Sequence, residues 1–146
     1  MGGRLKEDLV MGAWGTGPFE NDDAADFAGD LDEAEPAERH QLLISTMREA
    51  VDWNGYLGAD VACRVIAAVA VVASMMPNGP PIDANYGPAS DSVRHLALGP
   101  EMAELAHRAL LRVTGENSEW KDLWDVSEER SSTSEVVALL QAAVTK

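Results

Sequence analysis

The sequence predicts an all-α fold, in which a single domain forms a bundle of about six or seven helices around an apolar central helix. Three observations support this expectation. The 146 residues match one ordinary domain, which buries enough surface to fold without metals or disulfides. Most apolar residues recur at the three- and four-residue spacing of amphipathic helices. Capping and helix-breaking residues stand at the ends of these segments.

The amino-acid composition and net charge exclude several kinds of function. Hydrophobic residues make up 46% of the chain and charged residues 25%, which is typical of a globular protein. The 11 Lys and Arg against 25 Asp and Glu give a net charge of −14. This balance argues against nucleic-acid or anionic-membrane binding, because phosphates would be repelled. The single cysteine, Cys63, excludes an intramolecular disulfide and a multi-cysteine metal site.

The first ten residues carry charges where a secretory signal would have its apolar segment. We therefore expect a cytoplasmic protein. Residues 1–10 are interpreted as a disordered segment or an extension before a natural start at Met11, and residues 11–146 as the single helical domain.

Two helices are expected in the first third of the chain. Asn21 is a good N-cap, and Asp22 and Asp23 would follow it in the first turn, where carboxylates favour the helix dipole. The buried face of this helix would be Ala24, Phe27, Ala28 and Leu31. A second helix is expected from Pro36 to about Asp52, because proline is favoured in the first turn. Its inward residues would be Leu43, Met47, Ala50 and Val51.

Residues 59–76 form the apolar centre of the sequence, and two structures fit them. The valines and Ile66 favour a buried strand. The alanines favour a helix, and eighteen residues are long for a strand. We predict a helix that is apolar nearly all round and therefore surrounded by others. Its uninterrupted apolar run would measure roughly 18 Å, too short for a hydrocarbon core of roughly 30 Å, so we predict no membrane span.

A loop is expected after this helix, because residues 77–90 contain four prolines and two glycines. A short helix would run from about Asp91 to Leu98 and stop at Gly99 and Pro100.

Three helical segments are expected at the C-terminal end. The first, closed by Gly115, carries Met102, Leu105, Ala106, Ala109, Leu110 and Val113. Ser118 would cap a short helix with Trp120, Leu123 and Trp124. Ser132 and Glu135 match a capping box. The helix after them would bury Val136, Leu139, Leu140 and Ala143.

Acidic residues concentrate near the N-terminus, and no Lys or Arg lies between Glu7 and Glu38. Asp22, Asp26 and Asp30 are four residues apart and share a helix face. Such carboxylates could hold Mg²⁺ or Ca²⁺. A solvated face opposite the apolar residues explains them more simply, so we predict no metal and no cofactor.

Aromatic residues near turns are further candidates. The W-G-T-G-P-F segment lacks the preceding strand and the following G-K-[ST] of a phosphate loop. Gly15 and Gly17 are instead expected to permit a positive-φ turn that folds Trp14 and Phe19 onto the bundle. Trp53 and Tyr56 could likewise anchor in the core, or line a cleft with their polar tips.

Asp60 and Arg64 are spaced i, i+4 at the start of the central helix. They could form a helix-end ion pair, or they could face inward and create a polar pocket beneath Trp14. Cys63 has no neighbouring base and is interpreted as a small core residue. His40, His95 and His107 have no metal-site spacing.

The N-terminal motif resembles that of a family of small bacterial proteins catalogued as a domain of unknown function. The similarity is strongest from Gly12 to Phe27, in the pattern G-x-W-G-x-G-x-F-x-N-D-x-A-x-D-F. It is looser through residues 56–73 and 123–125. The resemblance implies a mainly helical single domain without an established activity, and it supplies no catalytic residues.

Two functional hypotheses follow. The first is a non-enzymatic binding or regulatory module whose acidic N-terminal face takes a basic protein or a cationic ligand. The alternative is a small-molecule or divalent-metal-dependent enzyme with a pocket near the Trp-Gly turn. The candidate residues are Trp14, Phe19, Asn21, Asp22, Asp26, Tyr56, Asp60 and Arg64. Self-association through the apolar helix is a third hypothesis, and the oligomeric state stays open.

Overall fold

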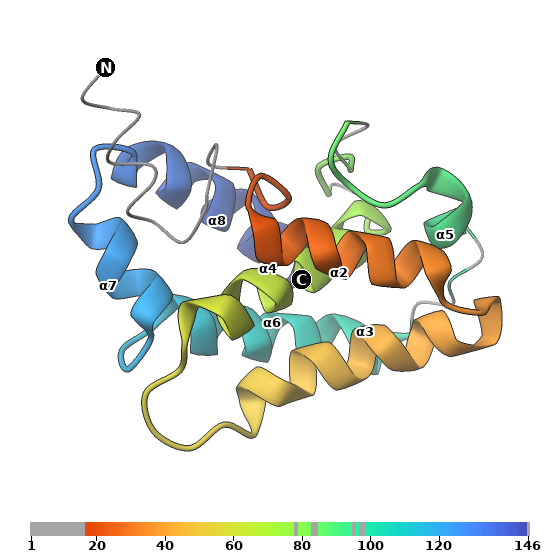
Figure 1. Cartoon of the computed structure of the whole chain (residues 1–146), viewed down its shortest axis with the longest axis horizontal. Coiled ribbons are helices and arrows are strands. Elements are labelled where there is room, and N and C mark those ends of the chain that lie inside the picture. Colours follow the sequence, from red (N-terminus) through yellow and green to blue (C-terminus); the bar gives the residue numbers. More distant parts are fainter. Residues whose placement is uncertain (1–16, 78, 83–84, 95, 97–98, 146) are drawn as a thin grey trace.

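The computed structural model of the chain describes residues 17–77, 79–82, 85–94, 96 and 99–145. Within these residues the fold is all-α, as predicted (Figure 1). The helices are α2 (Asp22–Glu33), α3 (Pro36–Val51), α4 (Ala59–Ser74), α5 (Ser90–Arg94), α6 (Pro100–Thr114), α7 (Glu119–Asp125) and α8 (Arg130–Thr145). None of the helices in these ranges is both long enough and apolar enough to span a bilayer. Residues 1–10, Trp14 and Gly15 lie outside the described residues.

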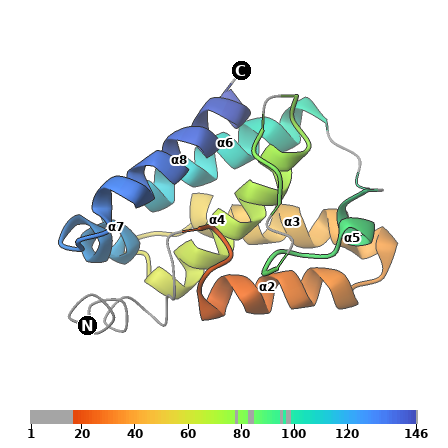
Figure 2. The ribbon, with the colours of Figure 1, turned by 90° about the horizontal axis from the view of Figure 1, so that it is seen from above.

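The central apolar segment is a helix, which confirms the choice of helix over strand. In α4 every residue except Asp60, Arg64 and Ser74 is buried. The helix contacts α2, α3, α6, α7 and α8, and Figure 2 shows it between α2 on one side and α6 with α8 on the other. Its alanines allow neighbouring helices to approach closely, so this one element supplies the middle of the core.

Local capping signals place the first two helices correctly. The Asn21 side chain accepts a hydrogen bond from the Ala24 backbone N–H at 2.8 Å. Pro36 is the first residue of α3. The Arg39 side chain closes the turn between the helices, since it donates to the carbonyl oxygens of Leu31 at 2.9 Å and Asp32 at 3.1 Å. These bonds satisfy carbonyls that α2 leaves unpaired at its end.

The proline-rich loop is attached to the end of α2. The Asp32 carboxylate accepts hydrogen bonds from the Ala89 backbone N–H and the Ser92 hydroxyl. Helix α5 spans Ser90–Arg94, whereas the predicted helix ran from about Asp91 to Leu98, and residues 95, 97 and 98 lie outside the described part. Gly115 is the C-cap of α6, as predicted.

The predicted capping box at the last helix is wrong. Helix α8 already begins at Arg130, so Ser132 and Glu135 lie inside it. Ser127 supplies the local signal instead, because its hydroxyl oxygen accepts from the Glu129 N–H at 3.0 Å. The buried face of α8 therefore also differs from the predicted one. Leu140 is 1% exposed, whereas Leu139, predicted to be buried, is 59% exposed.

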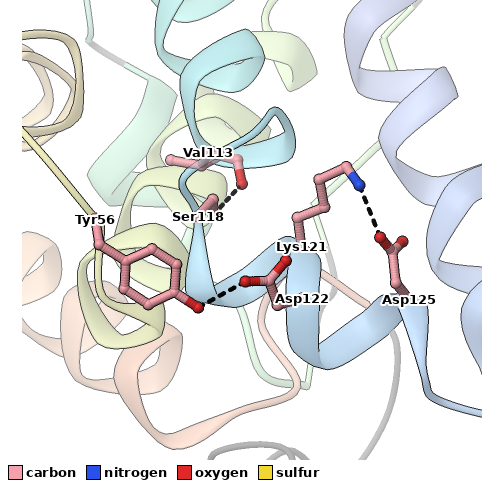
Figure 3. A network of polar contacts seen from close by, with 6 residues as sticks. All are labelled: Tyr56, Val113, Ser118, Lys121, Asp122 and Asp125. Atoms are coloured by element: carbon pink, nitrogen blue, oxygen red, sulfur yellow. Dashed lines mark hydrogen bonds and ion pairs between the residues drawn. The ribbon is translucent and has the colours of Figure 1, made fainter.

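Two smaller expectations also need correction. Among the described glycines only Gly55 has a positive φ, of 89°, so Gly17 does not make the positive-φ turn. Ser118 does occupy the N-cap position of α7, but its hydroxyl donates to the Val113 carbonyl at 2.5 Å and does not cap the helix. The side chain joins the end of α6 to the start of α7 (Figure 3).

Candidate binding site at the acidic end of the bundle

The first turns of α2, α4 and α7 all lie in the left half of the view in Figure 1. Each begins with carboxylates, which complement the positive end of a helix dipole. We call this region the acidic end and define it by Asp22, Asp23, Asp26, Asp60, Glu119 and Asp122. Residues from three distant parts of the sequence therefore meet in one negatively charged region.

The pKa of Asp23 shows that these carboxylates lie close to one another. Partial burial raises the pKa of Asp23, and repulsion from Asp60 raises it further. Arg64 acts in the opposite direction and does not cancel the effect. The first turns of α2 and α4 are therefore close enough for their charges to interact.

Asp60 and Arg64 do not form the expected helix-end ion pair. Arg64 instead lies 3.3 Å from the Glu49 carboxylate of α3. Asp60 is exposed, so it does not face an interior pocket. Arg64 thus links α3 to α4 and leaves the Asp60 carboxylate open to solvent.

The loops before α4 and α7 hold each other. Leu57 and Ser118 form an isolated parallel bridge, in which the Leu57 N–H donates to the Asn117 carbonyl at 2.9 Å and the Glu119 N–H donates to the Leu57 carbonyl at 2.8 Å. The Glu119 side chain also accepts from the Ala59 N–H at 2.9 Å. Helix α4 is therefore capped by a residue 60 positions away.

Two aromatic side chains, Trp53 and Tyr56, project from the loop before α4. The Tyr56 hydroxyl donates to Asp122 at 2.7 Å (Figure 3), and this bond is the main cause of its raised pKa. The Trp53 indole N–H donates to the Tyr56 carbonyl at 3.1 Å. Tyr56 is nevertheless 54% exposed and Trp53 39% exposed. Both rings are surface groups held in place by their polar atoms, and neither is a core anchor.

The predicted site residues thus divide into two groups. Asp22, Asp26, Asp60 and Tyr56 are exposed at or beside the acidic end. Phe19 is buried in the core, and Asn21 is used as a helix cap. Trp14 lies outside the described residues. Sequence reasoning missed Glu119 and Asp122, whose importance depends on α7 packing beside the start of α4 and has no local signal.

The chemistry available here is that of charge recognition. No group of three His, Cys, Asp or Glu side chains in the described ranges is arranged to hold a metal ion. Burial raises the pKa of the nearby Cys63 thiol to about 12, so it is a poor nucleophile near neutral pH. What the acidic end offers is exposed carboxylates beside two anchored aromatic rings.

A separate groove of about 670 Å³ lies between α3 and α6. Its lining combines Arg48 and Arg108 with Asp52, Glu101 and Glu104. Because two cations face three carboxylates, the groove has no clear preference for a ligand of either sign.

Comparison with curated proteins and with solved structures finds no match. Comparison with protein families finds one for which residues 12–135 match the family model. This range covers most of the chain and includes α2 to α7 completely, but only the first part of α8. The chain therefore belongs to the family described as domain of unknown function DUF4259.

Proposed function

We propose that this protein is a non-enzymatic binding module whose acidic end takes a basic protein partner. One observation supports the proposal most strongly. The first turns of α2, α4 and α7 bring their carboxylates together beside the exposed side chains of Tyr56 and Trp53. A net charge of −14 would steer a basic partner toward the molecule over a distance set by the ionic strength.

The charge at this end is largely uncompensated. Within the described chain Asp22, Asp26 and Asp60 form no ion pair, while the nearest cations are already engaged. Arg64 pairs with Glu49, and Lys121 pairs with Asp125 at 2.7 Å. An incoming Arg or Lys side chain would therefore find free carboxylates without breaking an existing pair.

The aromatic rings add a short-range contribution. Tryptophan and tyrosine are enriched among the residues that dominate binding energy in interfaces. A guanidinium group can also stack on an aromatic face while it pairs with a carboxylate. Hydrogen bonds already hold Trp53 and Tyr56, so binding would cost little additional side-chain entropy. Nothing specific in the described residues favours the enzyme hypothesis over this one.

The proposal can be tested by titrating an arginine-rich peptide into the protein and measuring fluorescence anisotropy at low and high salt. The test variant carries Asp22→Asn, Asp26→Asn and Asp60→Asn, and a second variant carries Tyr56→Ala. The matched control removes three exposed charges elsewhere, through Glu38→Gln, Glu104→Gln and Glu135→Gln.

We expect the test variant to bind about tenfold more weakly than the control, since several charge contacts are lost together. Tyr56→Ala should weaken binding by a factor that depends less on salt, because the lost contact is short-ranged. Equal losses in the test and control variants would contradict the proposal, since they would reflect net charge alone. Thermal melting of each variant verifies that it is folded.

A further inference from the structure

The groove of about 670 Å³ between α3 and α6 has an apolar base and charged edges. Both helices lie in the lower half of the view in Figure 1. The base is formed by side chains that pack against the core and stay partly open to solvent. They are Ile44, Val51 and Leu105, together with the buried Met102. The groove therefore offers apolar surface that another structural element could cover.

A ridge of exposed side chains runs along α6 beside the groove. Its members are spaced three or four residues apart and so project from one face of the helix. They are Glu101, Glu104, Arg108 and Leu111. Leu111 is 46% exposed and gives the ridge an apolar group. We call the groove and this ridge the α3–α6 face. A face in which a ridge borders a groove can pair with its own copy about a two-fold axis, because each ridge enters the other groove.

The charges of the α3–α6 face are nearly balanced, although the chain carries a net charge of −14. The groove is lined by two arginines and three carboxylates, which are Arg48, Arg108, Asp52, Glu101 and Glu104. Two copies of so acidic a protein repel each other over most of their surface. Repulsion is weak where cations and carboxylates are present in similar numbers, so a second copy can approach on this face.

These charged groups are also available for pairing. The ion pairs formed among the described residues at other positions involve Arg64, Arg94 and Lys121, and none of them uses a side chain of the α3–α6 face. In a two-fold arrangement, the ridge carboxylates of one copy reach the arginines that line the groove of the other. Each such contact is a charge-assisted hydrogen bond, and the symmetry forms every contact twice.

We propose that the α3–α6 face binds a second copy of the chain in a two-fold symmetric dimer. Leu111 of each copy enters the groove of the other and covers part of its apolar base. The carboxylates of Glu101 and Glu104 then face the two groove arginines of the other copy. The central helix α4 is not available for self-association, because nearly all of its residues are buried. None of the carboxylates that define the acidic end lines the groove, so the inference does not rest on the proposed function.

The test is sedimentation velocity of the full chain over a range of concentrations. At about 0.15 M salt, exposed charges more than about 8 Å apart interact little, so the contacts of the interface itself are measured. We expect a reversible equilibrium between monomer and dimer. A chain that is still monomeric at about 1 mM, or that forms assemblies larger than a dimer, overturns the proposal.

Two charge-reversal variants identify the interface. The first carries Arg48→Glu and Arg108→Glu, and the second carries Glu101→Arg and Glu104→Arg. Each variant places like charges opposite each other in the dimer, so each should dimerise at least about tenfold more weakly than the unmodified chain. An equimolar mixture restores opposite charges across the contact and should form a heterodimer. Both variants remain acidic, so attraction between them cannot come from their net charges.

The matched control reverses two exposed arginines outside the face, through Arg94→Glu and Arg130→Glu. It has the same net charge as the first variant and should dimerise nearly as well as the unmodified chain. Leu111→Ala should weaken the dimer about tenfold, because apolar contact is lost twice. Circular dichroism verifies that each variant is folded. Equal losses in the control and the first variant, or a mixture of the two charge-reversal variants that stays monomeric, would show that the α3–α6 face is not the interface.

Discussion

Burial decides the chemistry of the single cysteine. Cys63 lies on α4, where burial raises the pKa of its thiol to about 12 and the nearby Asp23 and Asp60 add to the effect. The thiolate is the reactive form, and at pH 8 it would be nearly absent. We predict that Cys63 does not react with Ellman's reagent in the folded protein. The same protein in guanidinium chloride should react fully, and fast modification without denaturant would contradict the burial.

Asp23 provides a second prediction at this scale. Its pKa is raised above 3.8, so the folded state binds the proton more tightly than the unfolded state. The ionised carboxylate therefore costs stability near pH 7, and this cost disappears as the pH falls below the unfolded value. We predict that Asp23→Asn raises the free energy of unfolding at pH 7, with a gain that vanishes near pH 3.

The matched control for this change is Asp22→Asn at the neighbouring exposed position. It should not stabilise the protein, because it removes a favourable interaction with the helix dipole. Urea denaturation at the two pH values measures both variants. A gain for Asp23→Asn that is equal at pH 3 and pH 7 would rule out ionisation as its cause.

At the scale of helices, the start of α4 depends on another helix. Gly58 at its N-cap offers no side chain, and the Ala59 N–H is bound by the Glu119 carboxylate of α7. We predict that Glu119→Ala lowers the free energy of unfolding by about 1 kcal/mol, the usual cost of a lost cap. Glu116→Ala, at an exposed position in the preceding loop, should change it much less. Chemical denaturation compares the two, and similar losses would show that the cap is unimportant.

The helices also differ in how well local patterns predict them. Asn21 and Pro36 mark helix starts correctly because both act within one turn of their own position. Ser132 and Glu135 match a capping pattern equally well, yet the turn at Ser127 begins the helix earlier. A short polar motif cannot reveal that a competing start lies a few residues upstream.

At the scale of the whole molecule, charge opposes the compact state. The net charge of −14 produces self-repulsion that salt screens. We predict that raising sodium chloride from about 0.05 M to about 0.5 M raises the melting temperature. The variant with Asp22→Asn, Asp26→Asn and Asp60→Asn should show a smaller increase. A melting temperature that falls with salt would mean that attractive ion pairs outweigh the repulsion.

The sequence by itself determined the helical class, the central position of α4 and the acidic character of the surface, because periodicity, composition and local caps act within a few residues. Only the tertiary structure decided which side chains meet. Arg64 pairs with Glu49 across 15 residues, Glu119 caps Ala59 across 60, and Tyr56 binds Asp122 across 66. Such contacts follow from how α7 and α3 pack against α4, and this packing cannot be predicted from local sequence propensities.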